Sequence, residues 1–310
     1  MFNKFEIAPV LLMVFNRPDE TKLVFNAIRK AQPKKLYIAS DGPRHNVVGE
    51  SEQCNKVKDI FNTIDWNCEV KTLFREQNLG CKYAVSSAID WFFENETKGI
   101  ILEDDTLPSN SFFQFCTELL DKYENDTRIM RISGFNPLSG KYEYKHDYFY
   151  SYYSFMWGWA TWKRVWSYND VEIPNWEAAK QNNIVNYYPF DKDRNACFRD
   201  AANGLDTWDY QFDFAILCQN GLQIVPTKSL IQNIGFNERA THTFSDHGSG
   251  RSQILSNELN FPITAPTDFM LPNHEFEKLL VKSSKPKLTI KRFIYQLYKS
   301  TLNILKDKIQ

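Results

Sequence analysis

The chain has 310 residues, which is enough for one large catalytic domain or two ordinary ones. Its composition, with 43% hydrophobic and 24% charged residues, is typical of a soluble globular protein rather than a disordered or fibrous one. The net charge of -1 gives no global electrostatic reason to bind nucleic acid, so nucleic acid is not an expected partner.

The cysteines and the N-terminal segment indicate where the protein works. Six cysteines occur without a CxxC pair or a zinc-like spacing, so we expect them to be reduced. The apolar run from Val10 to Phe15 is too short for a cleavable signal and ends in Asn16-Arg17-Pro18, and no stretch has the length of a membrane span. Together these features predict a cytoplasmic protein.

Short apolar runs alternate with amphipathic segments over the first 135 residues. Strands are predicted at 8–15, 35–40, 68–74, 100–102 and 129–133, and helices at 21–31, 50–62, 81–94 and 112–123. This alternation predicts an α/β fold with a mostly parallel sheet flanked by helices. Beyond it, residues 142–170 are rich in Tyr and Trp, and residues 180–210 are polar and are expected to be irregular.

The fourth predicted strand ends in three adjacent acids. Gly99-Ile100-Ile101-Leu102 runs directly into Glu103-Asp104-Asp105, and ligands collect at the carboxyl ends of such buried strands. Three neighbouring negative charges repel one another unless a cation or a hydrogen-bonded ligand compensates them. Mn²⁺ or Mg²⁺ would do so and would leave coordination positions for a diphosphate. Taken alone, the triplet is more typical of an acidic turn exposed to water.

Short motifs follow the predicted strands in a definite order. Asn16-Arg17 follows the first, Ser40-Asp41-Gly42 ends the second, Arg75 to Gly80 precedes the third helix, and the acidic triplet ends the fourth strand. This order resembles the nucleotide-binding half of a GT-A glycosyltransferase, a Rossmann-like fold. With Thr106 to Phe113 and Ser133-Gly134-Phe135-Asn136, the Glu-Asp-Asp form is most similar to the N-acetylglucosaminyltransferase I family.

Two later segments extend the resemblance to roughly residues 8–245. Gly158 to Trp166 is similar to the Gly-Trp segment of that family, and Trp208-Asp209 is similar to its Trp-Asp motif. Trp159 and Trp208 would therefore contact the ligand, and residues 148–166 would form a wall of the acceptor or donor-sugar site. Trp157, Trp159 and Trp162 cannot all face one ligand, so at least one of them is expected in the core.

The resemblance implies a role for each matching residue near the strand ends. Arg17 and Asp41 would contact the nucleotide, with Asp41 near the base. Asp105 would ligate the metal, whereas Glu103 and Asp104 would bind the ribose, the donor sugar or metal-bound water. Taken alone, Arg17 is more typical of a surface ion pair, and Asp41-Gly42-Pro43 of an ordinary turn.

Asp209 is the general base that the resemblance implies. It would take the proton of the acceptor hydroxyl while that hydroxyl attacks the anomeric carbon from the face opposite the diphosphate, so the configuration inverts. The chain departs from the family after Trp208-Asp209, because Tyr210 follows in place of a second acid. Asp206 and Asp213 are therefore rival candidates, and a carboxylate on a helix surface is the structural alternative for each.

Residues 233–250 are rich in polar residues and glycine and are predicted to form a loop that closes over the donor and the metal. His242 would contact the diphosphate or the ion, by analogy with some GT-A enzymes, with a solvated loop histidine as the alternative. Gly158, which lies between two tryptophans, predicts a close approach of backbones.

We expect residues 1–275 to form a GT-A catalytic domain, with a nucleotide-sugar-binding half at 1–135 and an acceptor-binding half at 136–275. Residues 276–310 are predicted to be a basic amphipathic tail, because the segment from Lys282 onward contains eight basic residues and one acid, Asp307. This tail would contact an anionic membrane at its cytoplasmic face or dock on the domain or on a second copy.

These features predict an inverting, divalent-metal-dependent glycosyltransferase. The resemblance favours a UDP-linked donor carrying an N-acetylhexosamine, and as acceptor a hydroxyl of a growing glycan, a lipid-linked glycan or a surface polysaccharide. A nucleotidyltransferase is one alternative, although that class usually has a glycine-rich phosphate loop where this chain has Asn16-Arg17-Pro18. The other alternative is a non-catalytic glycan-binding protein on the same fold.

Overall fold

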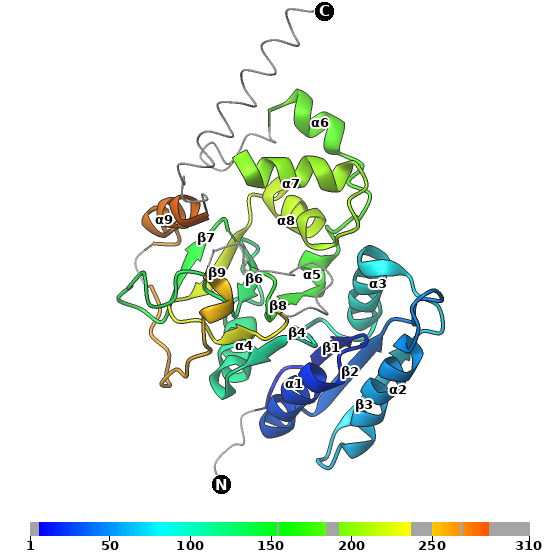
Figure 1. The fold of residues 1–310 in the computed structure, drawn as a ribbon. Coiled ribbons are helices and arrows are strands. Elements are labelled where there is room, and N and C mark those ends of the chain that lie inside the picture. Colours follow the sequence, from blue (N-terminus) through cyan, green and yellow to red (C-terminus); the bar gives the residue numbers. More distant parts are fainter. Residues whose placement is uncertain (1–5, 154, 184–191, 237–249, 267–268, 285–310) are drawn as a thin grey trace, which may run out of the picture.

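The computed structural model describes residues 6–153, 155–183, 192–236, 250–266 and 269–284. They form an α/β fold in which helices flank a mixed, mostly parallel sheet of eight strands (Figure 1). The strands of this sheet are β1 (Val10–Val14), β2 (Lys35–Ser40), β3 (Glu69–Phe74), β4 (Lys98–Glu103), β6 (Ile129–Ser133), β7 (Tyr148–Ser151), β8 (Trp159–Trp162) and β9 (Leu222–Pro226). A second, two-stranded sheet pairs β5 (Thr106–Pro108) with β10 (Ile231–Asn233).

The helices of the first half alternate with the strands, as the apolar periodicity predicts. They are α1 (Pro18–Ala31), α2 (Glu50–Ile60), α3 (Gly80–Asn95) and α4 (Asn110–Lys122). Helix α1 illustrates why these segments are helical. Pro18 occupies its first turn together with Asp19 and Glu20, where a missing N–H costs nothing and negative charge is favourable. The predicted strands and helices of this half are confirmed, with bounds that shift by a few residues.

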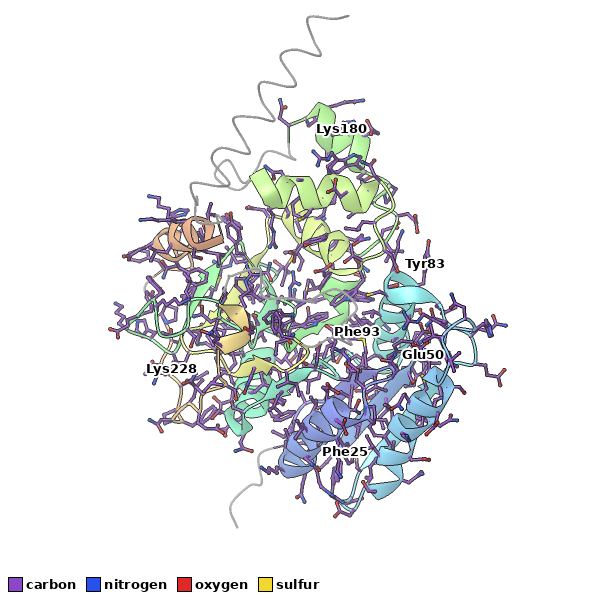
Figure 2. All side chains as sticks on the ribbon, viewed as in Figure 1. Phe25, Glu50, Tyr83, Phe93, Lys180 and Lys228 are labelled. Carbon is purple, nitrogen blue, oxygen red and sulfur yellow. The ribbon has the colours of Figure 1, made fainter. Side chains whose placement is uncertain are left out.

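The strand order explains where a ligand site forms. The order in the large sheet is β3-β2-β1-β4-β8-β6-β9-β7, and β1 pairs in parallel with both β2 and β4. The chain moves outward from β1 to β3 and then returns to β4, so right-handed crossovers place α1 and α2 on one face and α3 on the other. Phe25 of α1 and Phe93 of α3 are buried in these two layers (Figure 2). The carboxyl ends of β1 and β4 therefore form the topological switch point.

The second half adds antiparallel strands and short helices. β8 pairs antiparallel with β4 and β6, and β7 pairs antiparallel with β9. The helices here are α5 (Lys163–Trp166), α6 (Trp176–Gln181), α7 (Lys192–Ala202), α8 (Asp209–Cys218) and α9 (His274–Ser284). Gly158 has a φ of +60°, and a Cβ there would overlap the Ile231 side chain, which confirms the predicted close approach.

Residues 180–210 are less irregular than their polar sequence suggests, because α7 and the start of α8 lie within them. The expectation of irregular structure there is wrong for a reason of packing. Phe198 of α7 is fully buried, and its ring lies 5.6 Å from that of Phe214 in α8. A helix with so few apolar residues is stabilised by tertiary contacts rather than by a visible apolar stripe.

The end of the described chain also contributes to this second hydrophobic cluster. Phe276 and Leu280 of α9 are buried in it, next to Phe149 of β7. The predicted boundary between residues 275 and 276 falls inside α9, whereas residues 285–310 of the predicted basic tail lie outside the described residues. No helix in the described part of the chain is long and apolar enough to span a membrane.

Candidate functional site

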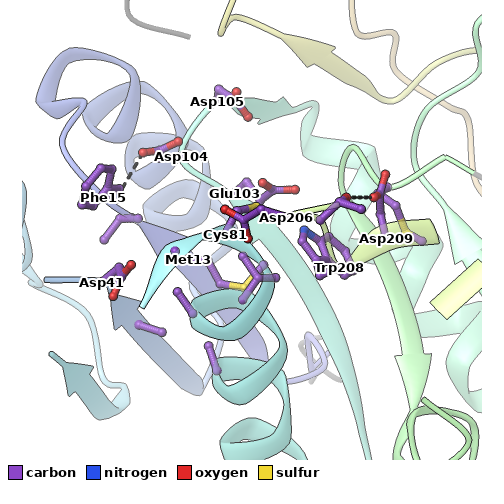
Figure 3. A pocket seen from close by; sticks show the side chains of 18 of the residues that line it. Met13, Phe15, Asp41, Cys81, Glu103, Asp104, Asp105, Asp206, Trp208 and Asp209 are labelled. Carbon is purple, nitrogen blue, oxygen red and sulfur yellow. Dashed lines mark hydrogen bonds between the residues drawn. The ribbon is translucent and has the colours of Figure 1, made fainter. Parts of the chain in front are cut away.

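A cavity of about 560 Å³ lies at the switch point between the two halves of the sheet. Its lining includes Phe15, Asn16 and Arg17 after β1, Asp41 after β2, Glu103, Asp104 and Asp105 at the end of β4, and residues 205–210 before and at the start of α8. Figure 3 shows Asp41 on one side of this cavity, Asp209 on the other, and Glu103 between them. One cavity therefore brings together most of the residues that the sequence motifs single out.

Arg17 bridges two acids of the triplet. Its Nη1 donates to Asp105 Oδ2 at 2.9 Å, and its Nη2 donates to Asp104 Oδ1. Asp104 also accepts a hydrogen bond from the Phe15 backbone N–H at 3.3 Å. Burial raises the pKa of Asp104 to about 6, although Arg17 opposes this shift. The arginine after β1 is thus not a surface residue, and it ties the first loop of the sheet to the fourth strand.

Glu103 differs from its two neighbours because its carboxylate has no hydrogen bond or ion pair with the described residues. Burial, together with the nearby charges of Asp105 and Asp104, raises its pKa well above the usual range. A half-buried carboxylate without a partner is costly, and a bound hydroxyl, amide or cation would lower that cost. Glu103 is therefore the acid of the triplet most in need of a ligand.

Asp41 holds the loop that follows β3. Its carboxylate accepts hydrogen bonds from the Gly42 N–H at 2.9 Å, the Asn78 amide at 2.9 Å and the Leu79 N–H at 3.0 Å. Burial raises its pKa, whereas these backbone donors oppose the shift. A carboxylate offers about four acceptor positions, so most of those on Asp41 already serve to order the start of α3.

Two arginines to which the sequence reasoning assigned no role also line the cavity. Arg44 pairs with the buried carboxylate of Glu50, which in turn accepts a hydrogen bond from Asn16 Nδ2 at 2.8 Å. Arg75 donates to Ser87 Oγ at 2.8 Å and has no ion pair with a described carboxylate. Arg75 directly follows β3, and this position at a strand end could have marked it as a candidate site residue. The residues at the ends of β1, β2 and β4 were predicted on the same basis. Both arginines add positive charge on the side of Asp41.

The three candidate bases have different surroundings. Asp209 is half-buried in the cavity wall, where its Oδ1 accepts hydrogen bonds from the Thr207 hydroxyl and from the Tyr210 N–H at 3.0 Å. Its Oδ2 receives no hydrogen bond from another described residue. Burial raises the pKa of Asp209, and the Thr207 hydroxyl opposes that shift. A carboxylate that has a raised pKa and one oxygen without a hydrogen-bond donor is suited to proton transfer.

Asp206 and Asp213 are engaged in contacts that hold the fold together. Asp206 accepts a hydrogen bond from the Lys82 N–H at 2.9 Å, in the first turn of α3. Asp213 is 7% exposed and forms ion pairs with Arg131, which is fully buried, and with Arg194. Asp213 is thus occupied by its arginines, whereas Asp206 and Asp209 both line the cavity and Asp209 is the more buried of the two.

The tryptophans divide between the core and the cavity. Trp159 is fully buried, and its ring stacks at 5.8 Å on that of Trp208, which lines the cavity. The prediction that Trp159 contacts a ligand is therefore corrected, because Trp208 and the rest of the core enclose its ring. Trp162 is also buried, whereas Trp157 lines the cavity and packs edge-on against Phe135. Trp157 precedes β8, and Gly158, which separates it from Trp159, has a left-handed backbone conformation, so the two rings do not follow one strand alternation.

A divalent ion is compatible with the donor atoms present. The acidic triplet supplies hard oxygen ligands from three acids, and Arg17 is the cation that pairs with two of them. The described residues contain no group of three acidic, histidine or cysteine side chains ready to enclose a metal. An ion at this position would accordingly be held by one or two carboxylates and by oxygens of a bound ligand, as is usual for Mg²⁺. His242 lies outside the described residues, so its predicted contact is not tested.

The sequence matches no protein-family model and no curated protein sequence. Among solved structures, apo UDP-glucose pyrophosphorylase is similar with 10% identity and a TM-score of 0.38, over 72% of this chain and 93% of that one. A putative glucose-1-phosphate thymidylyltransferase from Bacillus anthracis has 9% identity and a TM-score of 0.31, over 52% and 73%. The bifunctional WbbM glycosyltransferase has 12% identity and a TM-score of 0.27, over 44% and 24%.

These comparisons describe a distant similarity of fold. The chain is similar in architecture to nucleotidyltransferases and to a glycosyltransferase, and no specific family is identified. The chain's own sheet and cavity define an α/β protein with an acidic cavity at the switch point of its sheet. Any activity has to be argued from the cavity itself.

Proposed function

We propose that the protein is a divalent-metal-dependent glycosyltransferase that moves a sugar from a nucleotide diphosphate sugar to a hydroxyl group. The observation that supports this most is the shared cavity, which the strand-end residues Arg17, Asp41 and Glu103 line together with Asp209. Asp41 and Asp209 lie on opposite sides of it (Figure 3). Strand ends at a switch point suit a nucleotide, and a base across the cavity suits a second substrate. The resemblance to the N-acetylglucosaminyltransferase I family supports a UDP-linked donor, with an N-acetylhexosamine as the first sugar to try.

In this proposal each residue has a defined task. The nucleotide lies between the loops after β1 and β2, where Asp41 and Arg17 line the cavity. Glu103 and Asp104 contact the ribose or the donor sugar. A divalent ion at Asp105, when bound, neutralises charge on the diphosphate leaving group. Asp209 Oδ2 accepts the proton of the acceptor hydroxyl, which attacks the anomeric carbon and inverts it. The acceptor is proposed to be a growing glycan or a lipid-linked glycan.

Metal dependence can be measured directly through Asp105. We expect UDP to bind more tightly in calorimetry with Mn²⁺ than with EDTA, because Asp105 and the diphosphate share the ion. Asp105→Asn should remove about a tenfold gain in affinity, equivalent to about 1.4 kcal/mol. Asp65→Asn, at an exposed acid that pairs with Arg29, is the control and should keep the full gain. A full Mn²⁺ effect in Asp105→Asn would contradict the proposed ligation.

The pH profile of transfer should report the raised pKa of Asp209. A general base works only when it is deprotonated, so the rate should fall as the pH drops through that pKa. Because burial raises the pKa, we expect the acid limb of kcat/KM at a higher pH than for an exposed aspartate, which titrates near pH ~3.9. Thr207→Val removes the hydrogen bond that opposes the shift, and should move the limb further up. A limb that stays in place or moves down would argue against Asp209.

A sugar nucleotidyltransferase is the second candidate, because two of the distant structural neighbours are named as a thymidylyltransferase and a pyrophosphorylase. The test is a pair of assays on the same protein. A panel of nucleotide sugars, with and without Mn²⁺, detects transfer or donor hydrolysis. Nucleoside triphosphates with sugar 1-phosphates detect pyrophosphate release. Activity in the second assay alone would favour the nucleotidyltransferase, and absence of nucleotide binding would favour a non-catalytic glycan-binding protein.

A further inference from the structure

The first turn of α3 is held by carboxylates from both halves of the chain. On the nucleotide side, Asp41 accepts a hydrogen bond from the Leu79 N–H at 3.0 Å. On the other side, Asp206 accepts one from the Lys82 N–H at 2.9 Å. A Cβ added to Gly80 would lie 3.4 Å from Asp206 Oδ2, so this carboxylate sits directly beside the start of the helix. Figure 3 shows Asp206 between Glu103 and Asp209, next to Cys81.

These contacts are favourable for reasons that do not depend on a ligand. The first N–H groups of a helix have no partner within the helix, and negative charge is favourable at this end of the helix dipole. A second acid reinforces the attachment, because Glu172 accepts hydrogen bonds from Lys82 Nζ and from the Tyr83 hydroxyl, each at 2.9 Å. Tyr83 lies at this exposed end of α3 in Figure 2. The start of α3 is thus attached to the second half at two points.

The position of Asp206 in the chain links this attachment to the candidate base. Asp206 directly precedes Thr207, whose hydroxyl donates to Asp209. Trp208 then packs on Trp159 in the core. The segment from Asp206 to Asp209 is therefore anchored to α3 at one end and to the core in its middle. Loss of the first anchor would free the turn that presents the Asp209 carboxylate to the cavity.

We propose that Asp206 is a positioning residue that sets the place of Asp209 relative to the nucleotide. It does so because the first turn of α3 is bound both by Asp41 on the nucleotide side and by Asp206 on the side of the base. The proposal rests on the proposed function. Asp206 acts through its hydrogen bond to the Lys82 N–H and takes no proton in the reaction. The loop after β3 lines the cavity on the side proposed for the nucleotide. The first turn of α3, which follows this loop, binds Asp206 on the side of the proposed base. A displacement of the base by about 1 Å can cost about 100-fold in rate.

The test compares Asp206→Ala with Asp206→Asn. Asparagine still offers a side-chain oxygen to the Lys82 N–H, and Asn and Asp are similarly effective at the start of a helix. We expect Asp206→Ala to lower kcat about 10-fold to 100-fold, with the Kd for UDP and the acceptor KM within about threefold of wild type. Asp206→Asn should restore most of kcat. Because Asp206 is exposed, both variants are expected to fold, and thermal unfolding checks this.

Two results in this assay would overturn the proposal. An Asp206→Asn variant as slow as Asp206→Ala would assign a role to the charge or basicity of the carboxylate instead. Full kcat in Asp206→Ala would show that the attachment does not affect the base.

Hydrogen exchange provides a readout that needs no substrate. Asp206→Ala should speed amide exchange in residues 80–83 and 205–209, and Asp206→Asn should not. If wild type transfers no sugar with any donor, the proposed function fails, whereas the exchange result still decides whether the attachment exists. Equal exchange in all three proteins would contradict it.

Discussion

Asp209→Asn is expected to lower the rate of sugar transfer by about 10²–10⁴-fold, the usual contribution of a general base, while UDP binding stays within about threefold. The asparagine oxygen still accepts the hydrogen bonds that the Thr207 hydroxyl and the Tyr210 N–H give to Oδ1. The geometry of the turn should therefore persist, and only the basic oxygen is lost. Steady-state transfer kinetics and calorimetry with UDP measure the two effects separately.

Asp206→Asn is the matched control for this experiment, because it makes the same chemical change three residues earlier in the same cavity wall. It should stay within a few-fold of wild type. Transfer at the wild-type rate in Asp209→Asn would remove this residue from the mechanism, and the base would then have to be sought at Asp206. A parallel loss of UDP binding would show that Asp209 supports the nucleotide site and is not specific to the transfer step.

Asp213→Ala is expected to destabilise the protein by about 3–5 kcal/mol, as is typical when one partner of a buried ion pair is removed. The substitution leaves Arg131, which is fully buried, without the carboxylate that now neutralises it. Arg194 loses the same partner. Urea unfolding followed by circular dichroism should show a lower midpoint with an unchanged slope.

Asp200→Ala serves as the control for stability, because Asp200 is exposed and pairs with Arg199 at the surface of α7. Exposed pairs contribute about 0–1 kcal/mol, so its midpoint should hardly move. If Asp213→Ala is as stable as wild type yet inactive in transfer, Asp213 would have a chemical role and the structural assignment would be wrong.

The contacts of Arg17 change the interpretation of the acidic triplet. The three acids are not equivalent, because Asp104 and Asp105 share one guanidinium and Glu103 has no partner among the described residues. This arrangement leaves Asp105 with one oxygen outside the ion pair, which is the oxygen that the metal experiment probes. It also places a permanent cation at the end of β1, where a diphosphate would lie next to it.

The first half of the fold can be predicted from the sequence because the patterns that specify its strands and helices are local. Strands β1, β2 and β4 are short, largely apolar runs, and β3 is a mixed one. Each helix has its own periodicity, and the alternation of strands and helices suffices to predict a parallel sheet. The candidate residues at the strand ends follow from the same logic, since parallel strands bring their carboxyl ends to one edge. Arg17, Asp41 and Glu103 therefore meet in one cavity, as their positions in the chain predict.

The identity of the base and the surroundings of the tryptophans could be assigned only from tertiary contacts. The family resemblance favoured Asp209 as the base but left Asp206 and Asp213 as rivals, because nothing local separates three aspartates within eight residues. Tertiary structure separates them by their partners: the start of α3 for Asp206, a buried arginine for Asp213, and a neighbouring hydroxyl for Asp209. The same holds for the aromatic segment, in which Trp157 reaches the cavity and Trp159 does not. Periodicity specifies which side of its own element a residue occupies, whereas only packing specifies what lies opposite.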